Sequence, residues 1–183
     1  LRVGAMLRLD EAKGVDVLLD AAERLKGARP ELEWTVCGGG PDAMRWLRTV
    51  QNRKLDSSVR LAGMRNDRGA FFAGLEVFAS PGRRDGLSAA LLEALAAGVP
   101  CVAARNPSVE GLLEDGKHAV LVPPGDPAAL AAAVDDLLTN RDRALRMAAA
   151  GRALVEHRFR FEPAVVALHE LHERLAAGRP TRV

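Results

Sequence analysis

The sequence has 183 residues, with 26 Lys and Arg against 24 Asp and Glu and a formal net charge of +2. This length suits one domain with a substantial core, and the charge balance excludes a large basic surface that would recruit nucleic acid. No apolar run approaches the ~20 residues of a membrane-spanning helix. The two cysteines, Cys37 and Cys101, interrupt or end short apolar runs, which is typical of reduced core thiols. We therefore expect a cytoplasmic domain with no disulfide and no integral membrane segment.

Short apolar runs recur along the chain without strict alternation, as expected for a parallel sheet that is covered on both faces. The predicted strands are residues 2–7, 32–37, 59–62, 77–80, 99–103 and 119–122. Helical spacing lies between them, most clearly over 15–25 and 87–95. The alternation predicts a doubly wound α/β fold with a six-stranded parallel sheet and with ligands beyond the carboxyl ends of the strands.

The region after a turn cluster at 123–127 has a helical pattern with breaks near Asn140 and Arg160. We expect residues 1–177 to form a single domain and 178–183 to be a disordered tail. The first residue is Leu, and it leads at once into a predicted strand. We therefore expect that an N-terminal part of the protein precedes this sequence.

The loop after the first predicted strand carries Arg8 and Lys13, two cations five residues apart. An Arg fork and a Lys point charge can together bind one diphosphate, whose charge lies on few oxygens. A solvated charged loop that caps the next helix is the alternative on spacing alone.

The loop after the second predicted strand contains Gly38, Gly40 and Pro41 and leads into a helix. Its glycines permit close backbone approach. The pattern imitates a dinucleotide fingerprint, but that motif belongs on the first strand and requires an acidic residue at the end of the second strand. A nicotinamide or flavin site is therefore disfavoured.

The segment from 80 to 98 carries the most specific pattern, with Asp85 before a predicted helix and Glu93 as the one charged residue between 87 and 97. The helix N-terminus around Gly86, Leu87 and Ser88 offers unpaired amides and a partial positive charge to a phosphate. Glu93 lies roughly 8 to 10 Å further along the helix axis. This separation matches the distance across a diphosphate from the hexose to the ribose of a nucleotide sugar. The alternative makes Asp85 an ordinary N-cap and Glu93 the exposed edge of an amphipathic helix.

Together these segments resemble the C-terminal, donor-binding domain of group 1 (family 4) glycosyltransferases, enzymes of the two-domain GT-B fold. The family's Arg-Leu, three residues, Lys-Gly pattern is met at 8–14, and its Gly-x-Gly-Pro turn is met at 38–41. The spacing of its Glu-x7-Glu motif is met by Asp85 and Glu93, and similar segments follow at 114–116 and 121–127. The resemblance covers about residues 3–175 and implies a Rossmann-like half of a GT-B enzyme.

The resemblance implies that this chain binds the donor of a retaining, metal-independent glycosyltransferase with no cofactor, its substrate being a UDP- or GDP-linked sugar. Arg8 and Lys13 would bind the diphosphate and Asp85 the sugar hydroxyls, and these three are the implied catalytic residues. The implied donor-binding residues are Gly38, Gly40, Met64, Arg65, Gly86, Leu87, Ser88 and Glu93, with Met64 and Arg65 facing the base and Glu93 accepting from the ribose. The acceptor domain would lie N-terminal, and any contact with a membrane surface would come through it.

Several features depart from the family pattern. Asp85 stands where the family has Glu, and the aromatic-glycine pair that usually follows is missing, so sugar recognition is expected to differ. A non-catalytic nucleotide-sugar-binding module and a GT-B-like epimerase or phosphorylase remain alternatives. Arg83 and Arg84 have no assigned role beyond loop salt bridges, and the His169 to His172 stretch, with its histidines three apart, indicates a solvated helix face rather than a metal site.

Overall fold

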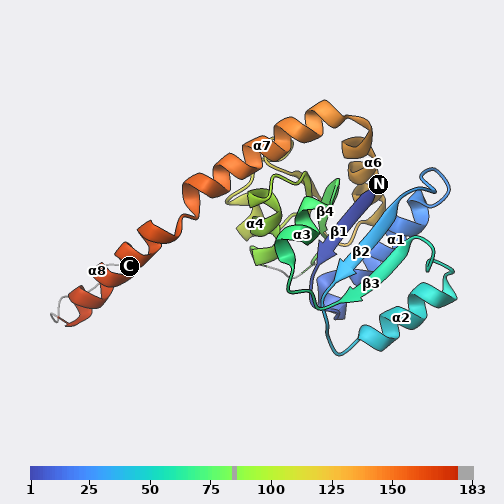
Figure 1. Cartoon of the computed structure of the whole chain (residues 1–183), viewed down its shortest axis with the longest axis horizontal. Helices are drawn as coiled ribbons and strands as arrows, with labels where there is room; N and C mark the ends of the chain where they lie inside the picture. The colour runs from blue at the N-terminus through green and yellow to red at the C-terminus, as the bar shows by residue number, and fades with distance from the viewer. Residues whose placement is uncertain (84–85, 177–183) are drawn as a thin grey trace.

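The computed structural model describes residues 1–83 and 86–176 as a parallel sheet flanked by helices, with a last helix that extends away from the body (Figure 1). The strands are β1 (Arg2–Met6), β2 (Glu33–Cys37), β3 (Val59–Gly63), β4 (Val77–Ser80), β5 (Cys101–Ala104) and β6 (Val120–Val122). A 3-10 helix, η1 (Glu11–Lys13), is followed by α1 (Val15–Leu25), α2 (Ala43–Asn52), α3 (Arg68–Ala73), α4 (Ala89–Ala96), α5 (Pro107–Glu110), α6 (Pro127–Thr139), α7 (Arg141–Arg158) and α8 (Phe161–Ala176).

All six strands run parallel in the order β3-β2-β1-β4-β5-β6, so the strand order reverses between β1 and β4. This confirms the predicted doubly wound sheet. At such a reversal the loops after the two central strands diverge to opposite faces and leave a crevice beyond the carboxyl ends. The fold therefore places the loops after β1 and β4 side by side at its natural ligand position.

Two apolar clusters cover the two faces of the sheet, and successive strand residues alternate between them. In β4, Val77 and Ala79 belong to the cluster that includes α1, α2 and α6, whereas Phe78 belongs to the cluster that includes α3, α4 and α5. Side chains on a strand point to opposite faces in turn, so burial on both faces requires a continuous apolar run. This explains why the strands could be recognised in the sequence.

Helix α7 packs closely on α4 because residue 151 is glycine. A Cβ at Gly151 would lie 2.6 Å from Leu95 Cδ2 and 2.9 Å from the carbonyl oxygen of His118. Buried residues of α4 thus lie between the sheet and α7. The contact lies at the C-terminal end of α4, where Leu95 is the next-to-last residue.

The C-terminal helices follow the predicted breaks, since α6 ends at Thr139 and α8 begins at Phe161. Residues 162–176 of α8 are exposed along their whole length. Its exposed apolar side chains include Val165, Val166, Leu168, Leu171 and Leu175. Residues 177–183, which include the expected tail, lie outside the described part of the chain.

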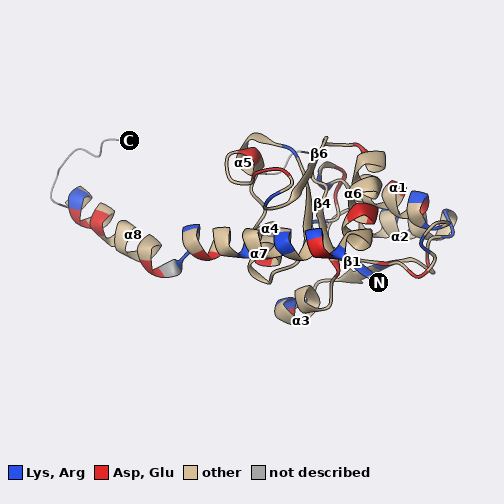
Figure 2. Cartoon of the chain, turned by 90° about the horizontal axis from the view of Figure 1, so that it is seen from above, with Lys and Arg blue, Asp and Glu red and all other residues tan. Residues whose placement is uncertain are grey.

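Charged residues of both signs are interspersed along the fold (Figure 2). Among the described helices none has the length and apolar character needed to span a membrane.

Candidate functional site

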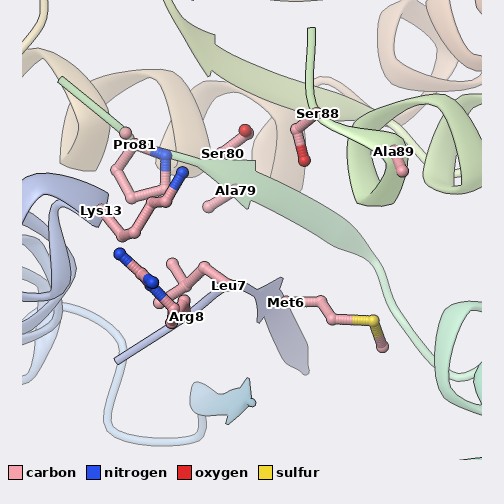
Figure 3. Close-up of a pocket in the computed structure, with 10 residues that line it drawn as sticks. Met6, Leu7, Arg8, Lys13, Ala79, Ser80, Pro81, Ser88 and Ala89 are labelled. Carbon is pink, nitrogen blue, oxygen red and sulfur yellow. The ribbon is translucent and has the colours of Figure 1, made fainter. Parts of the chain in front are cut away.

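A pocket of about 410 Å³ lies between the carboxyl ends of β1 and β4, at the reversal of the strand order. Its lining consists of Met6, Leu7, Arg8, Lys13, Ala79, Ser80, Pro81, Gly82, Ser88 and Ala89. Figure 3 shows Arg8 and Lys13 next to each other on one side and the Ser88 hydroxyl across from them. The structure therefore brings together residues from two sequence motifs. Arg8 and Lys13 belong to the first motif, and Ser88, 80 residues after Arg8, belongs to the second.

Arg8 follows β1, and its guanidinium is anchored at one end by an acid that the sequence analysis did not single out. The Arg8 Nε donates to Asp10 Oδ2 at 2.5 Å, and the side chains are 68% and 12% exposed respectively. The two Nη groups of Arg8 have no hydrogen-bond partner among the described residues, and Arg8 lines the pocket. Arg8 therefore presents two donor groups to any anion that enters.

Lys13 ends the 3-10 helix η1, and the residue after it joins the two pocket loops. Gly14 has φ 75°, and a Cβ there would lie 2.5 Å from the carbonyl oxygen of Pro81. A left-handed conformation and this close approach both require glycine. The close approach of Gly14 to Pro81 thus places the preceding residue, Lys13, beside the loop that follows β4.

Arg83 binds the two loops together from outside the pocket. Its Nη1 and Nη2 donate to the two carboxylate oxygens of Asp16 at 2.8 and 2.5 Å, and its backbone amide donates to the carbonyl of Ala12 at 3.2 Å. Partial burial raises the pKa of the Asp16 carboxyl, but the hydrogen bonds and charge of Arg83 outweigh this effect and hold that pKa below its ordinary value. This pair agrees with the loop salt bridge suggested for Arg83. Arg84 and Asp85 lie outside the described residues.

The N-terminus of α4 faces the pocket through Ser88 and Ala89. Ser88 is extended, with φ −72° and ψ 130°, and its hydroxyl makes no capping hydrogen bond. The first amides of a helix have no partner within it, so they can donate to an anion. Leu87 packs against the core and anchors the turn, while Gly86 is exposed.

Glu93 lies further along α4, half-exposed and outside the pocket lining. Arg68 of α3 contacts its Oε2 with Nε at 2.6 Å and Nη2 at 2.5 Å. This protein partner of Glu93, which lies 25 residues away, was not predicted from the sequence. The Oε1 atom has no hydrogen-bond partner among the described residues.

Gly38 and Gly40 support the pocket without lining it. A Cβ at Gly38, whose φ is 135°, would lie 1.8 Å from the Leu7 carbonyl oxygen, and one at Gly40 would lie 2.5 Å from that of Leu9. The Leu9 amide also donates to the Gly39 carbonyl at 2.9 Å. Both glycines therefore permit contact with the backbone on either side of Arg8.

Met64 and Arg65 lie beyond β3, two strands away from β1. Met64 is 81% exposed, while Arg65 donates from Nε to Asp67 at 2.8 Å and lies 6.0 Å from the ring centroid of Phe71. Neither residue lines the pocket at β1 and β4. Both follow the carboxyl end of β3, but Arg65 also lines a separate cavity with Arg2 and Glu33, which begin β1 and β2.

The family model described as "Glycosyl transferases group 1" matches residues 1–140. The chain belongs to the group 1 glycosyl transferases. The amylovoran biosynthesis glycosyltransferase AmsK of Erwinia amylovora is 30% identical over 184 residues, covering 96% of this chain and 45% of that relative. A GDP-mannose-dependent α-(1-6)-phosphatidylinositol monomannoside mannosyltransferase of Mycolicibacterium smegmatis is 34% identical over 163 residues, covering 82% and 42% respectively.

Solved structures of group 1 proteins and their relatives share the fold. Alr3699/HepE of Anabaena, in complex with UDP, matches with a TM-score of 0.84 at 23% identity and covers 96% of this chain and 48% of that one. The C-terminal domain of a group 1 family protein (LpcC) of Francisella tularensis matches with a TM-score of 0.77 at 20% identity, covering 87% and 86%. The chain spans about half the length of the curated relatives it matches. This group 1 domain is thus built like one half of the GT-B fold.

The two cysteines and the histidine stretch of this group 1 domain lie outside the pocket lining. Cys37 and Cys101 are buried free thiols, and burial raises the pKa of each. His169 lies 3.4 Å from Glu173 on the exposed surface of α8. Within residues 1–83 and 86–176, no three His, Cys, Asp or Glu side chains gather closely enough to hold a metal ion.

Proposed function

We propose that this chain binds the nucleotide-sugar donor of a glycosyltransferase in the pocket between β1 and β4. The observation that carries the proposal is the convergence of Arg8, Lys13 and the amide end of α4 on that pocket. All three favour negative charge, and a diphosphate presents its charge on closely spaced oxygens. A pocket of this volume is within the range of small-molecule sites.

The bond that breaks joins the sugar to the diphosphate, so negative charge grows on the leaving phosphate during the reaction. Donors fixed in advance around that phosphate stabilise the transition state more than the ground state. In this proposal Arg8 and Lys13 supply that stabilisation and no metal ion or other cofactor is required. Transfer proceeds with retention, and Asp85 accepts from the sugar hydroxyls.

The remainder of the donor would extend along the carboxyl edge of the sheet. Glu93 offers Oε1 to the ribose hydroxyls, and Met64 and Arg65 border the base. Gly86, Leu87 and Ser88 supply the turn whose amides face the phosphates. The relatives include a GDP-mannose-dependent enzyme, and the related solved structures include UDP complexes, so UDP- and GDP-linked sugars are the donors to test first.

We further propose that residues 1–177 act as one donor domain opposite an N-terminal acceptor domain. The partial match to the relatives' length supports this arrangement, and so do the exposed apolar side chains of α8, which would pack on that domain. The two buried thiols suit a reducing compartment, which for this protein would be the cytoplasm.

A thermal-shift screen of the 183-residue chain against UDP, GDP, ADP, their hexose conjugates and NAD tests the donor assignment. Ligand that binds only the folded state raises the melting temperature in a concentration-dependent way. We expect the melting temperature to rise with one nucleoside diphosphate and with the hexose conjugate of that nucleotide, and not to change with NAD. A shift with NAD alone, or none with any nucleotide, would overturn the proposal.

Transfer itself is tested on a full-length protein that carries this domain, with radiolabelled donor and product analysis. We expect the full-length protein to transfer the sugar and the 183-residue chain to bind the donor without transferring it. Binding without transfer by the full-length protein would favour a non-catalytic nucleotide-sugar-binding module. An isomerised sugar in place of a transferred one would favour an epimerase.

A further inference from the structure

Asp10, immediately beside the pocket, combines strong burial with incomplete pairing. Asp10 and His118 are the buried residues with a polar or charged side chain in the described part of the chain, with 8% and 7% of the whole residue exposed. Asp10 Oδ2 accepts from Arg8 Nε at 2.5 Å, whereas Oδ1 is buried and has no hydrogen-bond partner within the described part of the chain. The acid is thus enclosed while its cationic partner remains largely in the open pocket.

Stability alone does not account for this arrangement. A buried carboxylate is unfavourable unless its oxygens are satisfied, and an apolar side chain of similar size commonly does as well or better at such a position. Asp10 also makes no capping hydrogen bond to η1, the helix that follows it. A buried polar group that lacks a hydrogen-bond partner is unusual in a folded protein, and next to a pocket it indicates a functional constraint on the residue.

We relate this functional constraint to the two Nη groups of Arg8, which the hydrogen bond from Nε to Asp10 leaves available for a ligand. A free Arg side chain has many rotamers, and binding a ligand must restrict them at an entropic cost. An acid that holds Nε removes much of this freedom beforehand and leaves the two Nη groups for an anion. Figure 3 shows the guanidinium beside Lys13 at the pocket wall, where an anion would meet both cations.

We propose that Asp10 is a positioning residue that holds Arg8 through Nε, so that the Nη pair is directed at the anionic group of the ligand. The inference rests on the proposed function of the pocket. Asp10 is not itself among the residues that line the pocket, so its effect on binding passes through Arg8. If Asp10 did not act through Arg8, its negative charge near the pocket would instead repel the anion and weaken binding.

A double-mutant cycle separates these two roles. Binding of UDP and GDP is measured calorimetrically for the wild-type 183-residue chain, and the nucleotide that binds more tightly is followed in Asp10→Leu, Asp10→Asn, Arg8→Ala and the double variants. We expect Asp10→Leu to weaken binding by about tenfold, because one charge-assisted hydrogen bond no longer fixes Arg8. Asp10→Asn keeps a neutral acceptor for Nε and should lose less. In the Arg8→Ala background, neither change at position 10 should weaken binding further.

Asp135→Asn is the matched control, because Arg29 donates from Nε to Asp135 at 2.7 Å beyond the far end of α1. It should leave nucleotide affinity unchanged. Melting temperatures of the position-10 variants should stay near or above the wild-type value, which shows that lost affinity is not lost folding. If Asp10→Leu does not fold, the Asp10→Asn cycle with Arg8→Ala decides the question.

Four results would overturn the inference. Tighter binding in Asp10→Asn and Asp10→Leu would show that Asp10 acts as a repelling charge. Equal losses with and without Arg8 would show that Asp10 does not act through it. If Arg8→Ala weakens binding and Asp10→Leu does not, the inference fails alone, whereas absence of nucleotide binding by the wild-type chain removes the proposed function and this inference together.

Discussion

Arg68 and Glu93 form an ion pair between α3 and α4 in which both Nε and Nη2 of Arg68 contact the same oxygen, Oε2. The pair is exposed, with side-chain accessibilities of 45% and 41%. Oε1 of Glu93 accepts no hydrogen bond from any other described residue. The proposed ribose contact therefore depends on one carboxylate oxygen rather than two.

We expect Glu93→Ala to weaken binding of the preferred nucleotide by about tenfold or more, because a charge-assisted hydrogen bond to the ribose is lost. Arg68→Ala should weaken it by about fivefold at most, since an exposed ion pair contributes roughly 1 kcal/mol or less. The measurement is calorimetric titration with the nucleotide and its 2′,3′-dideoxy form. Glu93→Ala should bind the two forms about equally, and retention of the wild-type discrimination would contradict the ribose contact. Arg152→Ala, which breaks the exposed pair with Glu156, serves as the control.

Arg8→Ala and Lys13→Ala should each lower turnover of the full-length protein by ~100-fold or more. A fixed donor aimed at charge that develops in the transition state typically contributes about 3 to 4 kcal/mol. Steady-state kinetics with saturating donor check this prediction. Unchanged turnover in either variant would remove that residue from the mechanism.

Gly38→Ala and Gly40→Ala should destabilise the domain, because each Cβ would overlap a backbone carbonyl beside Arg8. At Gly38 the positive φ adds strain, so we expect the larger loss there, about 2 kcal/mol or more in the free energy of unfolding. Gly69→Ala in α3 is the matched control, since nothing lies within 4 Å of its Cβ position and alanine favours helix. Urea denaturation should show Gly69→Ala at or above wild type. Equal stability of Gly38→Ala and Gly69→Ala would contradict the close contact with Leu7.

Arg83→Met should lower the free energy of unfolding at neutral pH, by roughly 1 kcal/mol or less for a partly exposed pair. The pKa of Asp16 is lower in the folded chain than its ordinary value of 3.8, because Arg83 outweighs the effect of burial. The stability from this pairing is therefore present above that ordinary value and is lost as the pH falls through the folded pKa. Urea denaturation as a function of pH should show the difference between wild type and variant narrowing below about pH 4. A difference that widens on acidification would have the wrong sign for this pair.

Much of the fold could be predicted because burial on both faces leaves continuous apolar runs. The strand at 77–80 and the helix breaks near Asn140 and Arg160 are examples that the structure confirms. The short helices α3 and α5 have too few turns to show a period, and the sequence analysis did not predict them.

The site could be predicted only in part. Arg8, Lys13 and Ser88 were recognisable because they follow strands of a doubly wound sheet, whose ligands bind in the crevice beyond the carboxyl ends of the strands. The partners of these loops were not, since the pairing of Arg83 with Asp16 spans 67 positions and depends on loop geometry. The role of Gly38 and Gly40 was also not predictable from the sequence. Glycine is required both where the backbone approaches another part of the chain and where it approaches a ligand, so the residue type does not distinguish the two cases.

The most direct test of the account compares a nucleoside diphosphate with its parent nucleoside, UDP with uridine and GDP with guanosine, by calorimetric titration of the wild-type chain, Arg8→Ala and Lys13→Ala. If the pocket between β1 and β4 binds the diphosphate, one nucleotide should bind at least about tenfold more tightly than its nucleoside, and each variant should lose most of that advantage. Equal affinity for nucleotide and nucleoside, or an advantage that both variants keep, would contradict the account.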